Sequence, residues 1–261
     1  MNNILTEICT NKKKEIELAK KKCSFSSLEK IFHDKTNRNF KKLLTNSQKE
    51  KKNNIIAEIK KTSPSAGLII KDYFPENIAI DYEKSGAGSI SILTETSFFQ
   101  GNLDHLSLIN KKSNLPILRK DFIIDAYQIL ESKIYKADAI LLIVSILSDN
   151  QLKEFIDMAD KYGLDCIVET YNQTELERAL KIGYPIIGIN NRNLKNLSID
   201  INNTIDLIKN IPNEFIVVAE SGIKTKKDIN IYNKFGVYNF LIGESLLKAK
   251  NIELKIKELL D

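Results

Sequence analysis

The chain of 261 residues and 29.7 kDa is 43% hydrophobic and 28% charged, the composition of an ordinary globular protein with a sizeable core. Its length permits a single α/β barrel, and its three cysteines, odd in number and without CxxC spacing, argue against a disulfide framework or a zinc site. No apolar run approaches the roughly 18 residues that would span a bilayer, so we expect a cytoplasmic protein without a membrane partner.

The formal net charge of +5 is concentrated at the N-terminus. Residues 1–54 contain 14 Lys and Arg against 6 Asp and Glu, whereas the remainder has 25 against 28. Helical spacing of apolar residues predicts a helix over residues 2–22 and short helices within residues 25–54. We expect a helical extension, residues 1–54, packed on the main domain, residues 55–261, with its lysines in water, the two forming one structural domain. A basic arm that binds nucleic acid is the alternative. The apolar positions that favour packing are Leu5, Ile8, Cys9, Ile16 and Ala19.

The stretch Ile55–Lys60 is predicted to be a buried strand, because it is short and rich in β-branched residues. Side chains alternate along a strand, so Glu58 and Lys60 project to the same side. If that side faces the inside of a closed sheet, the two charges need partners or a ligand. Residues Thr62–Gly67 contain proline and glycine and are expected to form a loop.

Apolar runs alternate with amphipathic helical segments along the rest of the chain, which is typical of parallel βα units. Ser148 and Gln151 have the spacing of a capping box, and Gly183 ends a predicted helix. The further predicted strands are Ser89–Leu93, Pro116–Arg119, Asp138–Val144, Asp165–Val168, Ile186–Ile189, Phe215–Ala219 and Tyr238–Ile242. The main predicted helices are Pro75–Lys84, Asn102–Lys111, Ala126–Tyr135, the one opened by Ser148, Gln173–Ile182, Thr204–Lys209 and Lys226–Phe235.

Eight strands, each followed by a helix, predict an α/β fold that closes as a (β/α)8 TIM barrel with its site at the carboxyl ends of the strands. A doubly wound open sheet is the structural alternative. Such a sheet would usually carry a glycine-rich nucleotide turn, but the run GAGSIS at Gly86–Ser91 lacks the third glycine and precedes a strand.

Polar residues stand where the predicted strands end, and in a barrel these positions converge on one mouth. Each has a purely structural alternative, such as a surface ion pair between Lys120 and Asp121 or a helix-start carboxylate at Glu169. Ionisable groups after several apolar strands are costly unless they serve a ligand, which favours a functional site. These residues are Glu58, Lys60, Arg119, Lys120, Glu169, Asn190, Asn191, Arg192, Glu220, Ser221, Gly222 and Gly243.

The last two strands are each followed by small residues, in AESGIKTKKD and IGESLLK. In barrels of this type the loops after strands seven and eight commonly bind phosphate through backbone N–H groups. Gly222 and Gly243 permit the close approach that phosphate binding requires, although each could merely form a turn.

The two histidines, His33 and His105, lie far from the predicted strand ends, and we interpret both as structural or surface residues. No metal-ligand cluster, Gly-x-Ser-x-Gly elbow or Ser/His/Asp set is visible. Acid and base roles would then fall to Lys, Glu and Asn.

The segment AEIKKTSPSAG resembles the indole-3-glycerol phosphate synthase family, a decarboxylating lyase of tryptophan biosynthesis. The similarity runs in order from Ile55 to about Leu247. By resemblance the substrate is 1-(2-carboxyphenylamino)-1-deoxyribulose 5-phosphate, ring closure releases carbon dioxide and water, and no cofactor is needed. The further similar motifs are SILTETSFFQG, LPILRKDFIIDAYQI, ADAILLI, IVETYNQTELERAL, IIGINNRNL, VVAESGI and FLIGESLL.

The resemblance implies that Lys120 is the general acid that protonates the ribulose carbonyl as the anthranilate ring carbon attacks it. It places Lys60 near the substrate carboxylate and implicates it in the later dehydration. Glu169 and Glu58 either act as base or hold the lysines, and which group makes which proton transfer stays open.

The remaining site residues implied by the resemblance contact the substrate or order the site. Asn190 contacts the polar core of the substrate, and Arg192 and Glu220 order the site. The phosphate and polar contacts are Ser221, Gly222, Gly243 and Ser63. The apolar walls are Phe99, Leu118, Phe122, Leu141 and Leu194.

Two positions depart from the family pattern. Ala66 stands where many relatives carry Lys. Glu244 follows the phosphate glycine, where a carboxylate would repel a phosphate dianion, so we expect its side chain to turn away while its backbone N–H, with Ser245, serves the phosphate.

Rival functions differ in the residues they need. A phosphoribosylanthranilate isomerase or a sugar-phosphate epimerase would favour a different acid and base set, often with Asp or Cys at the strand ends. A nucleic-acid-binding protein would use the basic N-terminus and lose affinity steeply with salt. We expect a monomeric enzyme with a small phosphorylated substrate and no nucleic-acid partner.

Overall fold

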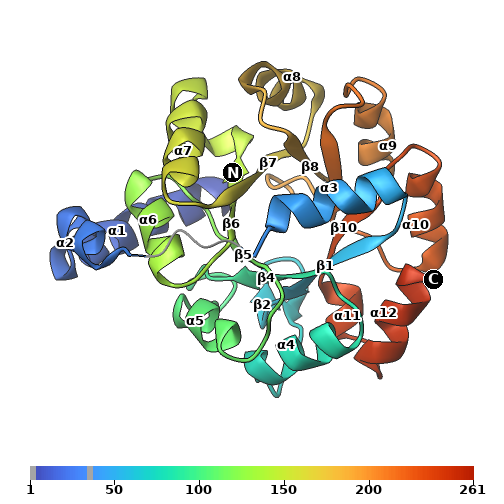
Figure 1. Cartoon of the computed structure of the whole chain (residues 1–261), viewed down its shortest axis with the longest axis horizontal. Coiled ribbons are helices and arrows are strands. Elements are labelled where there is room, and N and C mark those ends of the chain that lie inside the picture. Colours follow the sequence, from blue (N-terminus) through green and yellow to red (C-terminus); the bar gives the residue numbers. More distant parts are fainter. Residues whose placement is uncertain (1–3, 34–37) are drawn as a thin grey trace.

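Eight parallel strands close into a barrel in the computed structural model, which describes residues 4–33 and 38–261 (Figure 1). The first strand, β1, pairs with both β4 and β10, and this pairing closes the sheet. The predicted barrel is therefore confirmed, and the open sheet is excluded. The barrel strands are β1 (Asn54–Ile59), β4 (Ser89–Leu93), β5 (Ile117–Lys120), β6 (Ala139–Ile143), β7 (Asp165–Thr170), β8 (Ile186–Asn190), β9 (Ile216–Glu220) and β10 (Asn239–Ile242).

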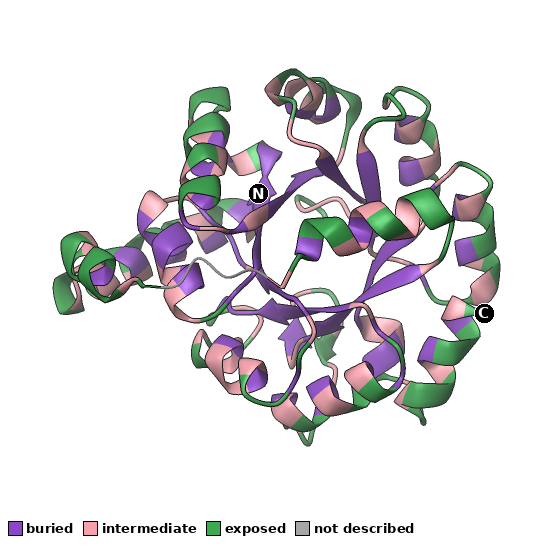
Figure 2. Cartoon of the chain, in the orientation of Figure 1, coloured by how far each residue is buried: buried purple, intermediate pink, exposed green. Residues whose placement is uncertain are grey.

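Helices surround the barrel and bury one face against it while their outer faces are exposed (Figure 2). The capping box of Ser148 and Gln151 is formed at the start of α7, and α8 ends at Gly183, as the sequence predicts. The surrounding helices are α4 (Pro75–Lys84), α5 (Asp104–Asn110), α6 (Ala126–Ile134), the 3-10 helix η1 (Val144–Ile146), α7 (Asp149–Lys161), α8 (Gln173–Ile182), α9 (Asn202–Ile208), α10 (Lys226–Asn233), α11 (Glu244–Leu247) and α12 (Ile252–Leu260).

Two apolar clusters follow from the alternation of side chains along the strands. The larger cluster lies between the strands and the surrounding helices and includes Ile55 and Ala57. The smaller one fills the barrel interior and includes Ile56 and Leu118. Because both faces of each strand are covered, the strands are apolar runs instead of alternating ones.

Three helices precede the barrel: α1 (Ile4–Lys22), α2 (Phe25–Ile31) and α3 (Phe40–Glu50). Helix α3 crosses the end of the barrel where the strands begin, as Figure 1 shows, and the backbone carbonyl of Leu44 accepts a hydrogen bond from Asn239 at the start of β10. Helix α1 lies at the opposite end, where Leu5 and Ile8 line a cavity. The predicted helices of the N-terminal segment are confirmed, except that residues 2, 3 and 34–37 lie outside the described residues.

Two sequence predictions need correction. The lysines of α1 do not all lie in water, because the side chain of Lys12 is buried, with 4% of the residue exposed. The segment Thr62–Gly67 is not a plain loop, since β2 (Thr62–Ser63) and β3 (Gly67–Leu68) form a small antiparallel sheet beside the barrel mouth.

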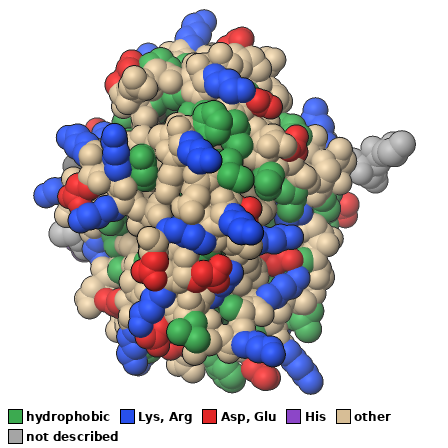
Figure 3. Space-filling view, turned by 90° about the vertical axis from the view of Figure 1, so that its right-hand side faces the viewer, with side chains coloured by type: hydrophobic (Ala, Val, Ile, Leu, Met, Phe, Trp, Pro, Cys, Tyr) green, Lys and Arg blue, Asp and Glu red, His purple; other side chains and the backbone are tan. Residues whose placement is uncertain are grey.

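Basic and acidic side chains are interspersed on the face around α10 and α12, with small apolar patches between them (Figure 3). Among the described residues, no helix combines the length and the apolarity needed to cross a membrane.

Candidate active site

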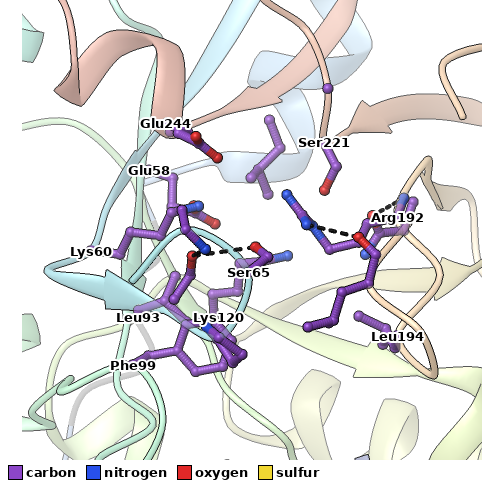
Figure 4. Close-up of a pocket in the computed structure, with 18 of the residues that line it drawn as sticks. Glu58, Lys60, Ser65, Leu93, Phe99, Lys120, Arg192, Leu194, Ser221 and Glu244 are labelled. Carbon is purple, nitrogen blue, oxygen red and sulfur yellow. Dashed lines mark hydrogen bonds and ion pairs between the residues drawn. The ribbon is translucent and has the colours of Figure 1, made fainter. Parts of the chain in front are cut away.

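A cavity of about 750 Å³ opens at the carboxyl ends of the barrel strands (Figure 4). Fifteen of the seventeen residues predicted for the site line it, and together they come from all eight barrel strands or the loops that follow them. They are Glu58, Lys60, Ser63, Phe99, Lys120, Phe122, Leu141, Glu169, Asn190, Arg192, Leu194, Ser221, Gly222, Gly243 and Glu244.

The two remaining predicted residues lie behind the cavity wall. Glu220 is fully buried and contacts Lys120, which lines the cavity. Leu118 is two residues before Lys120 on β5, so it faces the same side one layer deeper, inside the barrel cluster. Leu118 is therefore not among the residues that line the cavity, and its role as an apolar wall stays a prediction.

The charged pair predicted on β1 is formed. Lys60 donates to the carboxylate of Glu58, which is 3% exposed. Burial raises the pKa of Glu58, but the nearby ammonium groups of Lys60 and Lys120 outweigh it and hold this pKa below its ordinary value. Glu58 is therefore ionised at neutral pH.

Lys120 lies between two carboxylates supplied by other strands. Its Nζ is 2.8 Å from Glu220 on β9 and 3.4 Å from Glu169 on β7. Burial lowers the pKa of Lys120, but Glu220, Glu169 and Glu58 outweigh it and raise this pKa above its ordinary value. The side chain is consequently an ammonium ion, the form that can donate a proton.

Glu220 and Glu169 lie close enough to influence each other. Burial, followed by the neighbouring Glu169, raises the pKa of Glu220 to about 8, although Lys120 acts in the opposite direction. Asn190 donates to Glu169 over 3.2 Å and so orients its carboxylate. Glu220 thus retains a proton at neutral pH, beside the ammonium of Lys120.

Arg192 and Leu194 lie on the segment that follows β8, across the cavity from Lys60 (Figure 4). The backbone N–H of Arg192 donates to the side chain of Asn190 over 2.9 Å, and its guanidinium donates to the carbonyl of Leu197 over 3.1 Å. These contacts fix a cation at the mouth of the cavity.

The turns after β9 and β10 form the third side of the cavity. Ser221 and Gly222 both have positive φ, of 67° and 81°, so the chain turns sharply as β9 ends. Gly243 lies against β1, because a Cβ there would be 2.5 Å from Glu58 Oε1. Backbone N–H groups at such turns and at the first turn of α11 are suited to an anion.

Glu244 is paired with Lys248, its neighbour one turn along the helix, over 2.6 Å, and both residues line the cavity. This hydrogen bond is the main cause that lowers the pKa of Glu244. The hydroxyl of Ser245 donates to the carbonyl of Ile223 over 3.0 Å, so its proton is already used.

Several lining residues were not predicted from the sequence. The spacing of apolar residues in the sequence predicted the apolar face of α1. Nothing in that spacing indicated that this face would lie at the mouth of the barrel. The lysines were indistinguishable from surface lysines. These residues include Ile4, Leu5, Ile8, Asp121, Lys224, Lys248 and Lys255.

The histidines take no part in the cavity. His33 is exposed, and His105 is half-buried beside the ring of Tyr73, with 5.6 Å between ring centroids. Within residues 4–33 and 38–261, no group of three His, Cys, Asp or Glu side chains is arranged to hold a metal ion.

A closed (β/α)8 barrel with lysines and glutamates converging at the carboxyl ends of its strands is the architecture of a barrel enzyme. Similarity to known proteins narrows this class. A model of the indole-3-glycerol phosphate synthase family matches residues 5–259, and the chain belongs to that family, whose members are carboxy-lyases of tryptophan biosynthesis.

Curated relatives of the same description are similar over their full length. The protein from Endomicrobium trichonymphae is 46% identical over 261 residues, which cover 99% of this chain and 100% of the relative. The one from Legionella pneumophila (strain Paris) is 44% identical over 260 residues, which cover 100% and 99%. Among solved structures, a 3-hexulose-6-phosphate synthase superposes with a TM-score of 0.64 at 13% identity, covering 79% of this chain and 97% of that one, and this likeness shows the fold alone.

Proposed function

We propose that the cavity binds 1-(2-carboxyphenylamino)-1-deoxyribulose 5-phosphate and closes its ring to indole-3-glycerol phosphate. The observation that carries this proposal is the position of Lys120, a half-buried ammonium held by the buried carboxyl groups of Glu220 and Glu169 in a cavity that has apolar and cationic sides and turns suited to an anion. A substrate with an aromatic ring, a carboxylate, a carbonyl and a phosphate needs all of these features.

Each part of the substrate has a matching side of the cavity. The aromatic ring packs against Phe99 and Phe122, whose ring centroids are 6.3 Å apart. The phosphate lies at the turns of Ser221, Gly222 and Gly243, and the carboxylate faces Lys60. This arrangement folds the substrate so that its ring carbon approaches its own carbonyl, which supplies much of the catalysis by proximity.

Proton transfers then complete the reaction without redox chemistry. Lys120 donates a proton to the carbonyl oxygen as the ring carbon attacks it, which yields a hydroxyl group and a dearomatised ring. Loss of carbon dioxide restores the aromatic ring. The hydroxyl group leaves as water, with Lys60 assisting its departure and Glu58 or Glu169 accepting the proton lost from the adjacent carbon.

Substituting Lys120 tests the proposal. We expect Lys120→Ala to lower kcat by about 10²-fold to 10⁴-fold, which is the usual contribution of a positioned acid. Part of the substrate affinity should survive. The measurement is the fluorescence of the indole product, with EDTA present to test the expected independence of a metal. Lys153→Ala, which changes an exposed lysine on α7, serves as the matched control and should retain wild-type turnover.

Two outcomes would contradict these roles. Near-normal turnover of Lys120→Ala would remove this residue from the acid role. Folded wild-type protein without any signal would leave the barrel intact but overturn the substrate assignment, and isomerase and epimerase substrates would be assayed next.

We also infer the domain organisation, oligomeric state and location of the enzyme. The extension, residues 1–54, and the barrel, residues 55–261, would fold as one unit, since α3 covers one end of the barrel and α1 lines the cavity at the other. The protein would act as a cytoplasmic monomer on a small phosphorylated substrate, without nucleic acid. Sedimentation at a mass other than 29.7 kDa would contradict the monomer.

A further inference from the structure

A buried lysine on the N-terminal helix, outside the residues to which the resemblance assigns roles, contacts the segment that follows Lys120. Lys12 Nζ lies 3.0 Å from Asp121 Oδ1 and 2.7 Å from Glu15 Oε2. Lysine is almost never buried to 4% exposure unless its charge is paired, and removal of one partner of such a pair leaves a charge uncompensated. Lys12 is therefore held in one place by two carboxylates.

Asp121 connects Lys12 to Phe122, which lines the cavity. It is 2% exposed, and its Oδ1 also accepts the backbone N–H of Phe122 over 2.8 Å. Its Oδ2 accepts from Thr94 over 2.6 Å and from Arg119 over 3.0 Å. Asp121 thus fixes the backbone at the end of β5, where Phe122 turns into the cavity.

Glu15 connects Lys12 to a second loop, the one that follows β4. Its Oε1 accepts a hydrogen bond from the hydroxyl of Thr96, which lies in the loop after β4. In the same loop, the buried carboxylate of Glu95 accepts the backbone N–H of Phe99 over 3.0 Å. Lys12 and Glu15 together therefore connect α1 to the two loops that carry Phe99 and Phe122.

We propose that Lys12 is a positioning residue for substrate binding, which holds α1 against the loops after β4 and β5 and so fixes the aromatic wall formed by Phe99 and Phe122. The proposal rests on the proposed function, because it assigns the wall to the aromatic ring of that substrate. Leu5 and Ile8, on the same helix, line the cavity and complete the apolar side.

The effect of Lys12 should fall on binding more than on chemistry. The ammonium of Lys120 is held by Glu220 and Glu169, which come from strands that Lys12 does not touch. Loss of Lys12 would move the aromatic wall while this arrangement persists. A change of this kind raises KM and leaves kcat nearly unchanged.

The test is Lys12→Met, which keeps the length and apolar stem of the side chain but removes its charge. We expect roughly a tenfold rise in KM and in the inhibition constant of the product, with kcat within about threefold of wild type. Lys12→Arg keeps the charge and should restore most of the affinity.

Lys20→Met is the matched control, because Lys20 forms another ion pair between α1 and the barrel, with Asp125 over 2.7 Å, away from the cavity. We expect its KM to change by less than about twofold. Equal rises in KM for Lys12→Met and Lys20→Met would overturn the proposal in favour of general docking of α1. A fall in kcat with unchanged KM for Lys12→Met would also overturn it.

Hydrogen exchange provides a readout that needs no turnover. Lys12→Met should lose amide protection in α1 and in residues 96–99, whereas Lys20→Met should keep protection in residues 96–99. If the wild type shows no activity but Lys12→Met still loses this protection, the proposed function fails and the connection between α1 and the loop after β4 stands. Unchanged protection in Lys12→Met would overturn that connection. Should Lys12→Met not fold, Thr96→Val breaks the same connection from the loop side and should raise KM.

Discussion

Individual charges in the cavity are set by burial as much as by their partners. Lys60 and Lys120 bring two ammonium groups among the three glutamates Glu58, Glu169 and Glu220. Because burial and Glu169 raise the pKa of Glu220 to about 8, this residue keeps its proton at neutral pH. A protonated Glu220 avoids a further buried negative charge beside Glu169, which a poorly solvated site would disfavour.

Glu220 should therefore make stability depend on pH. Its folded pKa of about 8 lies above the ordinary value of 4.5, so its contribution is fully present below pH 4.5 and is lost as pH rises through 8. We expect the wild type to lose a few kcal/mol of unfolding free energy between about pH 5 and pH 9 relative to Glu220→Gln, which cannot ionise. Urea unfolding across this range measures the difference.

Glu177→Gln, at an exposed position on α8, provides the comparison and should follow the wild-type curve. Parallel pH curves for the wild type and Glu220→Gln would show that Glu220 is already ionised in the folded protein.

At the scale of secondary structure, barrel closure places the first strand beside the last. Glu58 on β1 thereby lies against Gly243 at the end of β10, and the turn that follows leads into α11. The sides of the cavity proposed for proton transfer and for phosphate binding therefore share a wall that has no room for an additional side chain.

Gly243→Ala should disturb both sides at once. Its Cβ would lie 2.5 Å from Glu58 Oε1, so either Glu58 or the turn must move. We expect kcat/KM to fall by about tenfold to a hundredfold, with KM raised, since displacements of this size strongly reduce catalysis. Steady-state kinetics with the indole fluorescence assay would measure the change.

Gly236→Ala serves as the control, because a Cβ there meets no atom within 4 Å and the residue precedes β10 at the opposite end of the barrel. Its positive φ of 81° should cost about 1 kcal/mol of stability with little change in kcat/KM. Similar kinetic losses in both variants would argue against the contact with Glu58.

At the scale of the whole molecule, the chain is cationic, with a net charge of +5, and the cavity has several basic residues around it. A substrate with a phosphate and a carboxylate would be attracted from a distance before it makes contact. The basic residues that line the cavity are Lys60, Lys120, Arg192, Lys224, Lys248 and Lys255.

Salt should therefore weaken substrate capture. Raising ionic strength from about 0.05 M to about 0.5 M shortens the screening distance severalfold, so we expect KM to rise several-fold while kcat is nearly unchanged. Lys224→Gln, with its charge removed, should have a higher KM at low salt and a weaker dependence on salt. A KM that is independent of ionic strength would contradict electrostatic capture.

The local sequence pattern was sufficient to predict the helices and strands and many of the residues that line the cavity. Alternation along β1 predicted that Glu58 and Lys60 share a side, and runs such as ADAILLIV predicted strands covered on both faces, because these properties depend on neighbouring residues. The predicted boundaries differ from the observed ones by one or two residues at several ends, such as Asn102–Lys111 against α5.

Contacts between distant segments were decided only by the closed barrel. In the sequence, Lys12 stands beside Lys13 and Lys14 in one basic run, and no local signal shows that it alone is buried. Leu118, expected as a wall of the cavity, lies in the apolar cluster inside the barrel, which side chains of several strands fill together. The sequence by itself therefore determined which strand ends supply polar residues to the cavity. The tertiary structure decided which charges meet and how deeply they are buried, because both depend on atoms brought together from distant parts of the chain.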